Sequence, residues 1–382
     1  MPPRTSSPAN KIVPAPPRAL ASRSAALVAR GLLDLARDSN WRIKKIFNGH
    51  TLRLALSSTG QLCAVLPRVP SNGESVALYD IELGRPAVAL SVRGKTPSVG
   101  CGLPAAFAWS PTASDLIAAW HGWGNRLYAF DPYREGSVGG FGEFSQFPDH
   151  LAWSESGKYF ASACAGGVQA RVRLWEAALD SKIGLPFAGS PLSEAGGPRS
   201  FEEWFDAHPL DPETGDESAF SGFGCIAFSL DESTLASVVE IEGEWADDSI
   251  VLLDVPTLRR LRTVQAQGHV TGLTWTFDSR NLIYCSAGQA YRIGPTSSET
   301  ESLPFGAELV ACHPHLPVCL CFSSWLRSSA KGRLFLADLD QLSVFDEYAS
   351  EGVVDLRWSC DGSKAYAVTA DGLAYIYEPL PL

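Results

Sequence analysis

The sequence has no apolar stretch close to the ~20 residues that span a bilayer, and its N-terminus has no apolar core followed by a cleavage site. We therefore expect neither a membrane span nor secretion. Positive charge is also scarce among the 382 residues, because 31 Lys and Arg residues face 42 Asp and Glu residues and leave a net charge of −11. That balance repels polyanions and argues against direct binding of nucleic acid.

Known catalytic motifs are absent as well. The chain contains no His-Glu-x-x-His, no Gly-x-Ser-x-Gly, no phosphate-binding Gly-rich loop followed by Lys, and no Cys-x-x-Cys. These motifs place nucleophiles, bases or metal ligands at the spacing that their chemistry needs. We therefore expect no enzymatic activity, no cofactor and no metal.

The nearest approach to a metal site is the segment ACHPHLPVCLC, which carries Cys312, His313, His315, Cys319 and Cys321. Cys319 and Cys321 share one face of an expected strand and, with His315, have the ligand types that bind a soft metal. Small core residues flanking a Pro-containing turn explain the same positions, and we favour that interpretation. The nine cysteines fall mostly in apolar runs without regular spacing, which predicts buried free thiols in a reducing, cytoplasmic compartment.

Residues 1–39 differ in composition from the rest of the chain. They are rich in Pro, Ala and Ser, and their first acidic residue is Asp34. This composition predicts a disordered tail. Between Leu20 and Arg37, apolar and charged residues separate onto opposite helical faces, which predicts a short helix docked on the main domain. Organelle targeting and attachment to a membrane surface remain alternatives.

What the sequence does contain is a repeat. The segment LAWSESGKYFASAC, from Leu151, shows an apolar residue, a spacer, an aromatic anchor, a small polar residue, a turn and an alternating apolar strand. This order is typical of a β-hairpin. With that copy there are seven, whose anchors are Leu56, Trp109, Trp153, Phe228, Trp275, Ala311 and Trp358.

A second signature follows each hairpin, namely a short apolar strand. It ends in an acidic residue in six of the seven copies: Asp80, Asp131, Glu176, Asp254, Asp338 and Glu378. The anchors are 36 to 53 residues apart, except for one interval of 75. A period of roughly 45 residues with several short strands per unit is typical of a β-propeller blade. We therefore expect an all-β fold, a seven-bladed β-propeller in residues 40–382, with the anchor tryptophans packed between blades.

These residues resemble the WD-repeat family. Gly49-His50 and Gly268-His269 are similar to its Gly-His opening, and Trp175-Glu176 is similar to its Trp-Asp close. The resemblance covers roughly residues 40–382 and implies a non-catalytic platform for protein interaction. It also implies that the loops between second and third strands share one face with the connections from each blade to the next.

The two ends of the repeat array are expected to meet in one blade. The last repeat ends shortly after Glu378, with no room for a fourth strand, whereas Trp41 to Phe47 precedes the first repeat and has no earlier partner. We expect this N-terminal strand to complete the seventh blade and to close the ring. Closure covers strand edges that would otherwise invite aggregation.

The long interval between anchors predicts a loop insertion, residues 190–217, between blades 3 and 4. Loops longer than ~12 to 15 residues are often functional. The insertion and the second-to-third loop of blade 4 lie on the expected common face, and both combine acidic with aromatic residues. The partner-binding candidates are Glu202, Glu203, Trp204, Phe205, Asp206, Glu240, Glu242, Trp245, Asp247 and Asp248.

We expect this acidic rim to project into solvent and to bind a protein or peptide partner through a basic segment, with tryptophan supplying the desolvated contact. A merely solvated loop is the alternative for the rim. For the whole chain, a monomeric interaction platform is the favoured function. The alternative is a hydrolase-like propeller enzyme whose active site collects acids from different blades in the central channel.

Overall fold

The computed structural model of the chain describes residues 41–47, 51–57, 60–67, 76–90, 106–111, 116–119, 127–130, 137–141, 148–164, 171–176, 193–196, 220–241, 247–294, 297, 299–324 and 331–378. Every regular element in these ranges is a β-strand. The tail and helix expected in residues 1–39 lie outside them, as does the 190–217 insertion apart from residues 193–196. No helix in the described part of the chain is long and apolar enough to cross a membrane.

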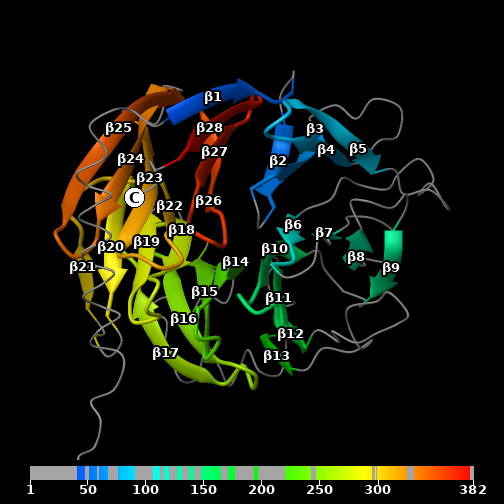
Figure 1. Ribbon diagram of the computed structural model, residues 1–382. Helices are drawn as coiled ribbons and strands as arrows, with labels where there is room; N and C mark the ends of the chain where they lie inside the picture. The colour runs from blue at the N-terminus through cyan, green and yellow to red at the C-terminus, as the bar shows by residue number, and fades with distance from the viewer. Residues whose placement is uncertain are drawn as a thin grey trace, which may run out of the picture.

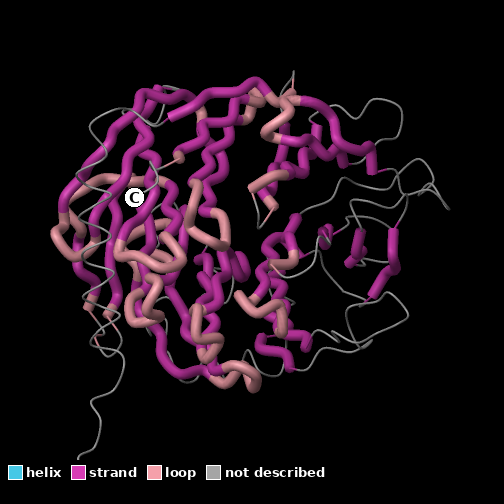
Figure 2. The backbone as a smooth tube through the Cα atoms, in the orientation of Figure 1, coloured by secondary structure: helices cyan, strands magenta, loops and turns pink. Residues whose placement is uncertain are grey.

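The strands form seven four-stranded antiparallel sheets around a common centre (Figures 1 and 2). Blade 1 contains β2 (Thr51–Leu56), β3 (Leu62–Pro67), β4 (Val76–Asp80) and β5 (Arg85–Leu90). Blade 2 contains β6 (Ala106–Trp109), β7 (Leu116–Ala119), β8 (Leu127–Phe130) and β9 (Ser137–Phe141). Blade 3 contains β10 (Pro148–Trp153), β11 (Tyr159–Cys164), β12 (Arg171–Glu176) and β13 (Ser193–Gly196).

Blade 4 contains β14 (Phe220–Phe228), β15 (Thr234–Ile241), β16 (Ser249–Asp254) and β17 (Arg260–Gln265). Blade 5 contains β18 (Val270–Trp275), β19 (Leu282–Ser286), β20 (Gln289–Ile293) and β21 (Thr300–Ser302). Blade 6 contains β22 (Leu309–Cys312), β23 (Val318–Ser324), β24 (Lys331–Asp338) and β25 (Ser343–Glu351). Blade 7 contains β26 (Val353–Trp358), β27 (Ala365–Thr369), β28 (Leu373–Tyr377) and β1 (Trp41–Lys45).

The first strands of the blades make a continuous ring of contacts. They touch in the order β2, β6, β10, β14, β18, β22 and β26, and β26 then touches β2. Apolar clusters lie between consecutive blades, from blades 3 and 4 through to blades 7 and 1. The sheets of blades 4 to 7 therefore bury both faces against their neighbours, and the all-β propeller predicted from the sequence is confirmed.

The small polar residue after each anchor holds the first hairpin of its blade. The Oγ atom of Ser154, for example, accepts the backbone N–H of Tyr159 at 3.0 Å. The same bond, from the residue five positions further on, is made at Ser57, Ser229, Thr276 and Ser359. The repeat pattern thus reflects a turn in which a hydroxyl group replaces a missing backbone acceptor.

The sixth anchor assigned from the sequence, Ala311, is wrong by one position. Cys312 pairs with Cys319 across the hairpin, and in the other blades it is the anchor that pairs with the residue seven positions later. His313 therefore occupies the place of the turn serine. Its Nδ1 atom accepts the backbone N–H groups of His315 at 2.9 Å and of Leu316 at 3.0 Å. An imidazole nitrogen therefore holds this turn through the N–H groups two and three positions further on, whereas the hydroxyls accept the one five positions further on, so the pattern of Ser and Thr did not reveal it.

The acidic residue after the third strand caps the next turn. Asp80 Oδ1 accepts the backbone N–H of Leu83 at 2.8 Å, and Asp338 Oδ1 accepts that of Gln341 at 2.8 Å. Because neighbouring strands are antiparallel, these turns and those of the first hairpins lie at one end of the ring, which we call the turn end. The second-to-third loops and the connections between blades lie at the opposite, loop end.

The anchor tryptophans bond across the joints between blades. The indole N–H of Trp275 donates to the carbonyl of Ala227, in the preceding blade, at 3.0 Å. The same bond joins Trp109 to Ala55 at 2.9 Å and Trp358 to Ala311 at 3.1 Å. All three indoles are buried, as predicted, whereas Trp153 is half-buried. A single position of the repeat therefore supplies both bulk and a hydrogen bond to each of these joints.

The N-terminal strand β1 lies in the same blade as the last strand. It pairs with β28 from Trp41 opposite Tyr377 to Lys45 opposite Leu373, so that blue β1 lies beside red β28 in Figure 1. The Trp41 ring packs 5.2 Å from that of Tyr377 and 6.1 Å from that of Tyr348 in β25. Residues from both ends of the chain thus complete one sheet.

Two truncations test whether β1 closes the ring. Removing residues 1–40 leaves β1 in place, whereas removing residues 1–50 exposes the edge of β28 and uncovers Tyr377. We expect thermal unfolding to show an unchanged midpoint for the first truncation and a clearly lower one, with aggregation, for the second. Equal midpoints would show that β1 is dispensable.

Two substitutions of Trp275 separate its bulk from its hydrogen bond. Trp275→Ala should lower the free energy of unfolding by about 3 to 5 kcal/mol, because it leaves a cavity in the joint. Trp275→Phe keeps a ring but loses the N–H donor to Ala227, so the expected loss is about 1 to 2 kcal/mol. Urea unfolding measures both, and equal losses would mean that ring volume contributes nothing.

Candidate functional site in the central channel

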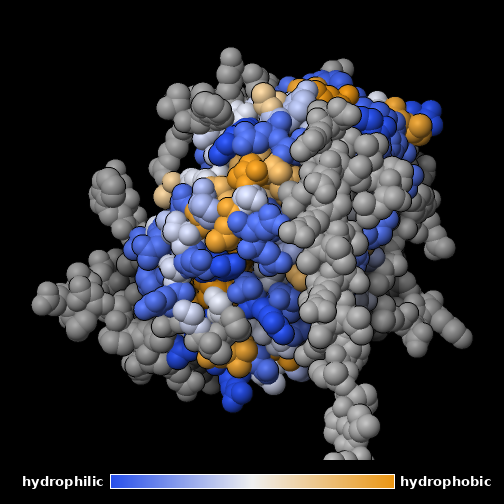
Figure 3. All heavy atoms as spheres, turned by 60° about the vertical axis from the view of Figure 1, so that its left-hand side comes forward, coloured by the Kyte–Doolittle hydropathy of each residue, from blue (hydrophilic) through white to orange (hydrophobic). Residues whose placement is uncertain are grey.

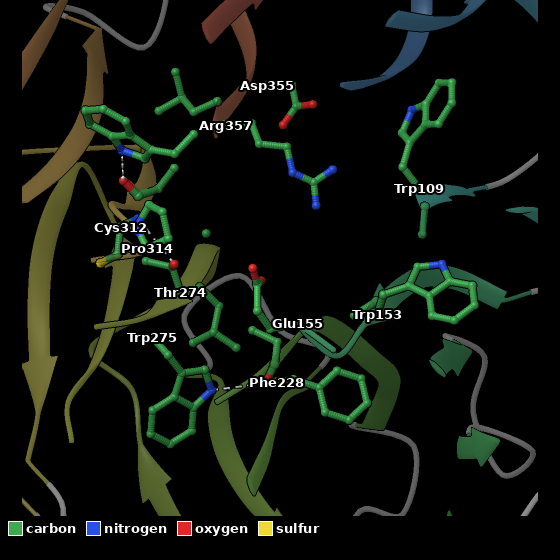
Figure 4. A pocket seen from close by; sticks show the side chains of 18 of the residues that line it. Trp109, Trp153, Glu155, Phe228, Thr274, Trp275, Cys312, Pro314, Asp355 and Arg357 are labelled. Carbon is green, nitrogen blue, oxygen red and sulfur yellow. Dashed lines mark hydrogen bonds between the residues drawn. The ribbon is translucent and has the colours of Figure 1, made fainter. Parts of the chain in front are cut away.

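A cavity of about 500 Å³ occupies the centre of the ring. Residues of all seven first strands line it, and Glu155, Leu230, Pro314 and Cys360 extend its wall to the turn end. Figure 4 shows that the side chains of Glu155, Asp355 and Arg357 point into the open centre. These three charged groups, from blades 3 and 7, are the features of the channel that need a chemical explanation.

Arg357 breaks a regular feature of the ring. The residue before the anchor is small in the first six blades and a long cation in blade 7: Ala55, Ala108, Ala152, Ala227, Thr274, Ala311 and Arg357. Where the anchor of the following blade is tryptophan, the residue there is alanine, as Ala55 is for Trp109 and Ala227 is for Trp275. After blade 7 the following anchor is Leu56, which is smaller than tryptophan and has no donor group. A large side chain before one joint is thus matched by a small anchor after it.

Arg357 and Asp355 both bond to Leu56. Arg357 Nη1 donates to the Leu56 carbonyl at 2.7 Å, so here the donor belongs to the preceding blade, whereas the indole donors at other joints belong to the following blade. The Asp355 carboxyl accepts a hydrogen bond from the Leu56 backbone N–H. Burial raises the pKa of Asp355 to about 6, although the Arg357 charge and the backbone N–H groups of Leu56 and Leu356 oppose the shift. Asp355 therefore changes its charge within the mildly acidic range.

Several polar groups of the described channel wall are engaged by the fold itself. Thr274 Oγ1 accepts the Cys312 backbone N–H at 3.4 Å. Burial raises the pKa of the Cys312 thiol well above its ordinary value, which disfavours the thiolate that a nucleophile needs. Asp355 and Glu155 are the carboxyl groups of this wall. The Asp355 carboxyl already accepts the Leu56 backbone N–H, whereas Glu155 is exposed at the turn end.

The Cys and His segment of blade 6 has a structural role. Burial lowers the pKa of His313 to about 4, so the ring is neutral, and its Nε2 atom lies 3.1 Å from the Gly362 carbonyl of blade 7. Cys319 and Cys321 are buried, with their Sγ atoms 3.5 Å apart. Within the described ranges, no three His, Cys, Asp or Glu side chains are grouped to hold a metal ion.

The cysteines of the described residues agree with the sequence prediction in being free thiols, and burial is complete for only some of them. The seven whose side chains are described are free thiols, and four of them are buried: Cys63, Cys285, Cys319 and Cys321. Burial raises the pKa of Cys63, Cys285 and Cys321, which keeps these groups protonated. Protonated, enclosed thiols are slow to oxidise.

Most of the partner-binding candidates lie outside the described residues, namely Glu202, Glu203, Trp204, Phe205, Asp206, Glu242 and Trp245. The backbone of Glu240 belongs to β15, at the loop end, but its side chain is not described. Asp247 lies at the same end and is exposed. The structure therefore brings the positions of Glu240 and Asp247 to one end of blade 4.

The expectation that Asp248 projects into solvent is wrong. Its side chain is buried, and Oδ2 accepts the backbone N–H of Val270 at 2.8 Å. The same oxygen lies 3.0 Å from Nδ1 of His269, in the connection to blade 5. A buried N–H without an acceptor is costly, so this carboxylate is retained inside the fold. Asp248 ties a loop to the next blade and is removed from the rim.

Sequence reasoning missed Glu155, Asp355 and Arg357. A signal for the last two was present, since the seventh repeat reads DLRWS where most other copies carry small or apolar residues before the anchor. Their partner, Leu56, is some 300 residues earlier, so only the closed ring shows why the charges are there. Glu155 lies in a first-hairpin turn, and the sequence alone does not distinguish an acid in such a turn that faces the channel from one that does not.

Comparisons with known proteins place the fold but not the family. No family model matches the chain, and no curated protein sequence matches it. Among solved structures, a chain in the crystal structure of the mitotic checkpoint complex is similar, with a TM-score of 0.59 and 12% identity. The alignment covers 91% of this chain and 97% of that one. At this identity the likeness shows the fold alone, a β-propeller of the WD40-like kind.

The raised pKa of Asp355 predicts a pH effect of defined sign. Because the folded state holds this proton more tightly than the unfolded state, the Asp355 contribution to stability should decline as the pH rises from about 4 to 6. Asp355→Asn should therefore gain stability relative to wild type between pH 4.5 and 7.5. Urea unfolding at both pH values measures the change.

Asp361→Asn is the matched control. Hydrogen bonds from Ser359 and Ser363 lower the pKa of Asp361 to about 2, so its stabilising contribution is complete above pH 4 and is lost only below it. The stability difference between Asp361→Asn and wild type should therefore be equal at pH 4.5 and 7.5. The assignment to Asp355 would be refuted if Asp355→Asn also gave equal differences at the two pH values.

Proposed function

We propose that this chain is a non-catalytic platform for protein interaction, built as a seven-bladed ring closed by β1. The observation that carries the proposal is the way the ring is held. Indole donors and apolar clusters join consecutive blades, so the loops at the two ends sit on a stiff frame. A stiff frame limits the ordering cost of binding, because only the partner has to become ordered.

The loop end near blades 3 and 4 is the binding face in this proposal. The 190–217 insertion and the loop after Glu240 combine acids with tryptophan, and Asp247 is exposed beside them. A basic segment of a partner would be attracted to this field, whereas tryptophan contacts would slow its dissociation. The solved propeller of similar fold belongs to a multi-protein complex, which is consistent with such a role.

The polar outer wall on the side of blades 5 and 6 favours the two ends of the ring as the places where a partner binds. Figure 3 turns the side of blades 5 and 6 forward and shows hydrophilic residues on both sides of narrow apolar bands. Arg292 with Glu301, and Arg333 with Glu347, form ion pairs on these outer strands. A monomer in a reducing compartment such as the cytoplasm fits these polar walls and the free thiols, and both are part of the proposal.

A charge reversal tests the binding face. The triple variant Glu240→Lys, Glu242→Lys and Asp247→Lys should weaken partner capture most at low ionic strength, because exposed charges mainly speed association. It should leave the free energy of unfolding within about 0.5 kcal/mol of wild type. Affinity purification with quantitative mass spectrometry at two salt concentrations, alongside a variant lacking residues 190–217, measures the effect.

The matched control reverses three exposed acids at the turn end, Glu176, Glu299 and Asp340, and so changes net charge by the same amount. It should capture the same partners as wild type. Equal loss in the two triple variants would show that net charge alone matters. Unchanged capture by the Glu240 variant and by the deletion would move the binding face elsewhere.

A channel enzyme is the second candidate, and one observation favours it. Asp355, with a pKa of about 6, and Glu155 come from different blades and point into one cavity, as a general acid and its partner carboxylate would (Figure 4). Hydrolysis of a glycoside panel, abolished by Glu155→Gln, would establish this function in place of the platform.

A further inference from the structure

The interface between blades 7 and 1, the closing joint, is held differently from the other joints described. Across three joints a tryptophan indole donates to a carbonyl of the preceding blade. At the closing joint the anchor is Leu56, and side chains of β26 supply the bonds instead. Arg357 donates to the Leu56 backbone carbonyl, and the Asp355 carboxyl accepts the Leu56 backbone N–H. Charged groups thus replace a neutral donor at the place where the chain ends meet.

A second set of charges bridges the same joint at the turn end. Lys364, in the first hairpin of blade 7, lies 3.0 Å from Glu82 of blade 1 and 2.6 Å from Glu378. Arg42 of β1 lies 2.5 Å from Glu378 and 3.5 Å from Glu82. Although burial opposes it, bonding to Lys364 and Lys44 lowers the pKa of Glu82, so this carboxylate stays charged. Side chains here are 32 to 46% exposed, so dissolved ions reach them.

The closing joint is also bordered by a cavity. A cavity of about 460 Å³ lies over it, lined by Gln61, Glu82, Asp361, Lys364 and Tyr366 among others. This cavity and the central channel share Ser359 and Cys360 in their walls. Water and ions therefore approach the joint from the channel and from the turn end. Attraction between charges falls as ionic strength rises, since the screening length shortens from ~10 Å at 0.1 M to ~3 Å at 1 M.

We propose that the closing joint is a salt-sensitive gate in the ring. At high ionic strength blade 1 separates from blade 7, which keeps β1 paired with β28, while the joints that rest on indoles and apolar side chains without such ion pairs across them stay closed. Opening joins the channel to the cavity over the joint and makes one groove from the centre of the ring to its outside. An extended chain segment could then enter sideways, without threading through the ring.

Buried cysteines report on this opening. Cys63 of β3 has no exposed surface and belongs to the apolar cluster between blades 7 and 1, with Leu56, Tyr366 and Ile376. Cys319 and Cys321 belong to the cluster between blades 5 and 6. Burial raises the pKa of Cys63 and of Cys321, and the thiolate is the reactive form, so the closed ring protects both. Opening of one joint exposes one reporter.

The experiment follows alkylation of the full chain by N-ethylmaleimide with peptide mass spectrometry, at constant pH in 0.1 M and 1 M NaCl. We expect Cys63 to react on the order of tenfold faster at 1 M, because screening weakens the closing joint. Cys319 and Cys321 should react at the same rate in both. Equal rates for Cys63 at the two salt concentrations, or parallel acceleration of all three thiols, would overturn the proposal.

Variants connect the effect to the charges. Arg357→Met should raise the Cys63 rate at 0.1 M to the wild-type value at 1 M and remove its dependence on salt. Lys364 lies outside the channel. Lys364→Met should also raise the Cys63 rate at 0.1 M, so it keeps the test valid if Arg357→Met does not fold. Lack of any change in Cys63 with a folded Lys364→Met protein would count against the gate.

The matched control is Arg292→Met. Arg292 pairs with Glu301 at 2.6 Å and donates to the Leu339 carbonyl of blade 6 at 3.3 Å, so it is a charge at another joint. Its loss should leave the Cys63 rate and salt dependence unchanged. If it raised the Cys63 rate as Lys364→Met does, the effect would be general destabilisation, and the gate would be excluded. The partner-binding proposal is unaffected by either outcome, because it concerns the loop end.

Discussion

Packing of each blade against the next is the constraint on which the rest of the structure depends. A four-stranded sheet with two apolar faces cannot remain exposed to water on either of them, so every blade needs a neighbour on both sides. The ring satisfies this need only when the last blade meets the first. At several joints the size of the anchor is related to the residue before the anchor in the preceding blade, since tryptophan meets alanine and the smaller Leu56 meets Arg357.

Much of this arrangement could be predicted from the sequence because the periodic signals are local. The anchor, the turn hydroxyl and the terminal acid each act within one hairpin, as Ser154 with Tyr159 and Asp80 with Leu83 show. Where the chemistry changed, the prediction slipped. His313 holds its turn with a ring nitrogen and through other backbone N–H groups than the serines use, and the pattern therefore placed the sixth anchor at Ala311 instead of Cys312.

The candidate site could be predicted much less well, since its side chains bond to residues that are distant in the sequence. Arg357 is an ordinary surface cation in sequence, and it becomes a joint residue only because closure brings Leu56 to it. Asp248 shows the opposite case. It lies in an acidic loop and looks solvent-exposed, yet the connection to blade 5 presents the Val270 N–H, and that donor draws the carboxylate inside. Loop composition predicts charge but not which charges the fold uses.

The difference between acids that the fold uses and acids that it leaves in solvent affects what the net charge of −11 implies about partners. Several acids of the described turns are structural acceptors, among them Asp80, Asp231, Asp278, Asp338 and Asp361. Hydrogen bonds from Ser359 and Ser363 to Oδ1 hold the pKa of Asp361 at about 2, so this group stays ionised while one of its oxygens is engaged by the turn. Such acids contribute to the field around the protein, but one oxygen of each is already engaged within its own turn. Evidence for a basic partner therefore has to come from acids that the fold leaves exposed, as Asp247 is, and not from overall composition.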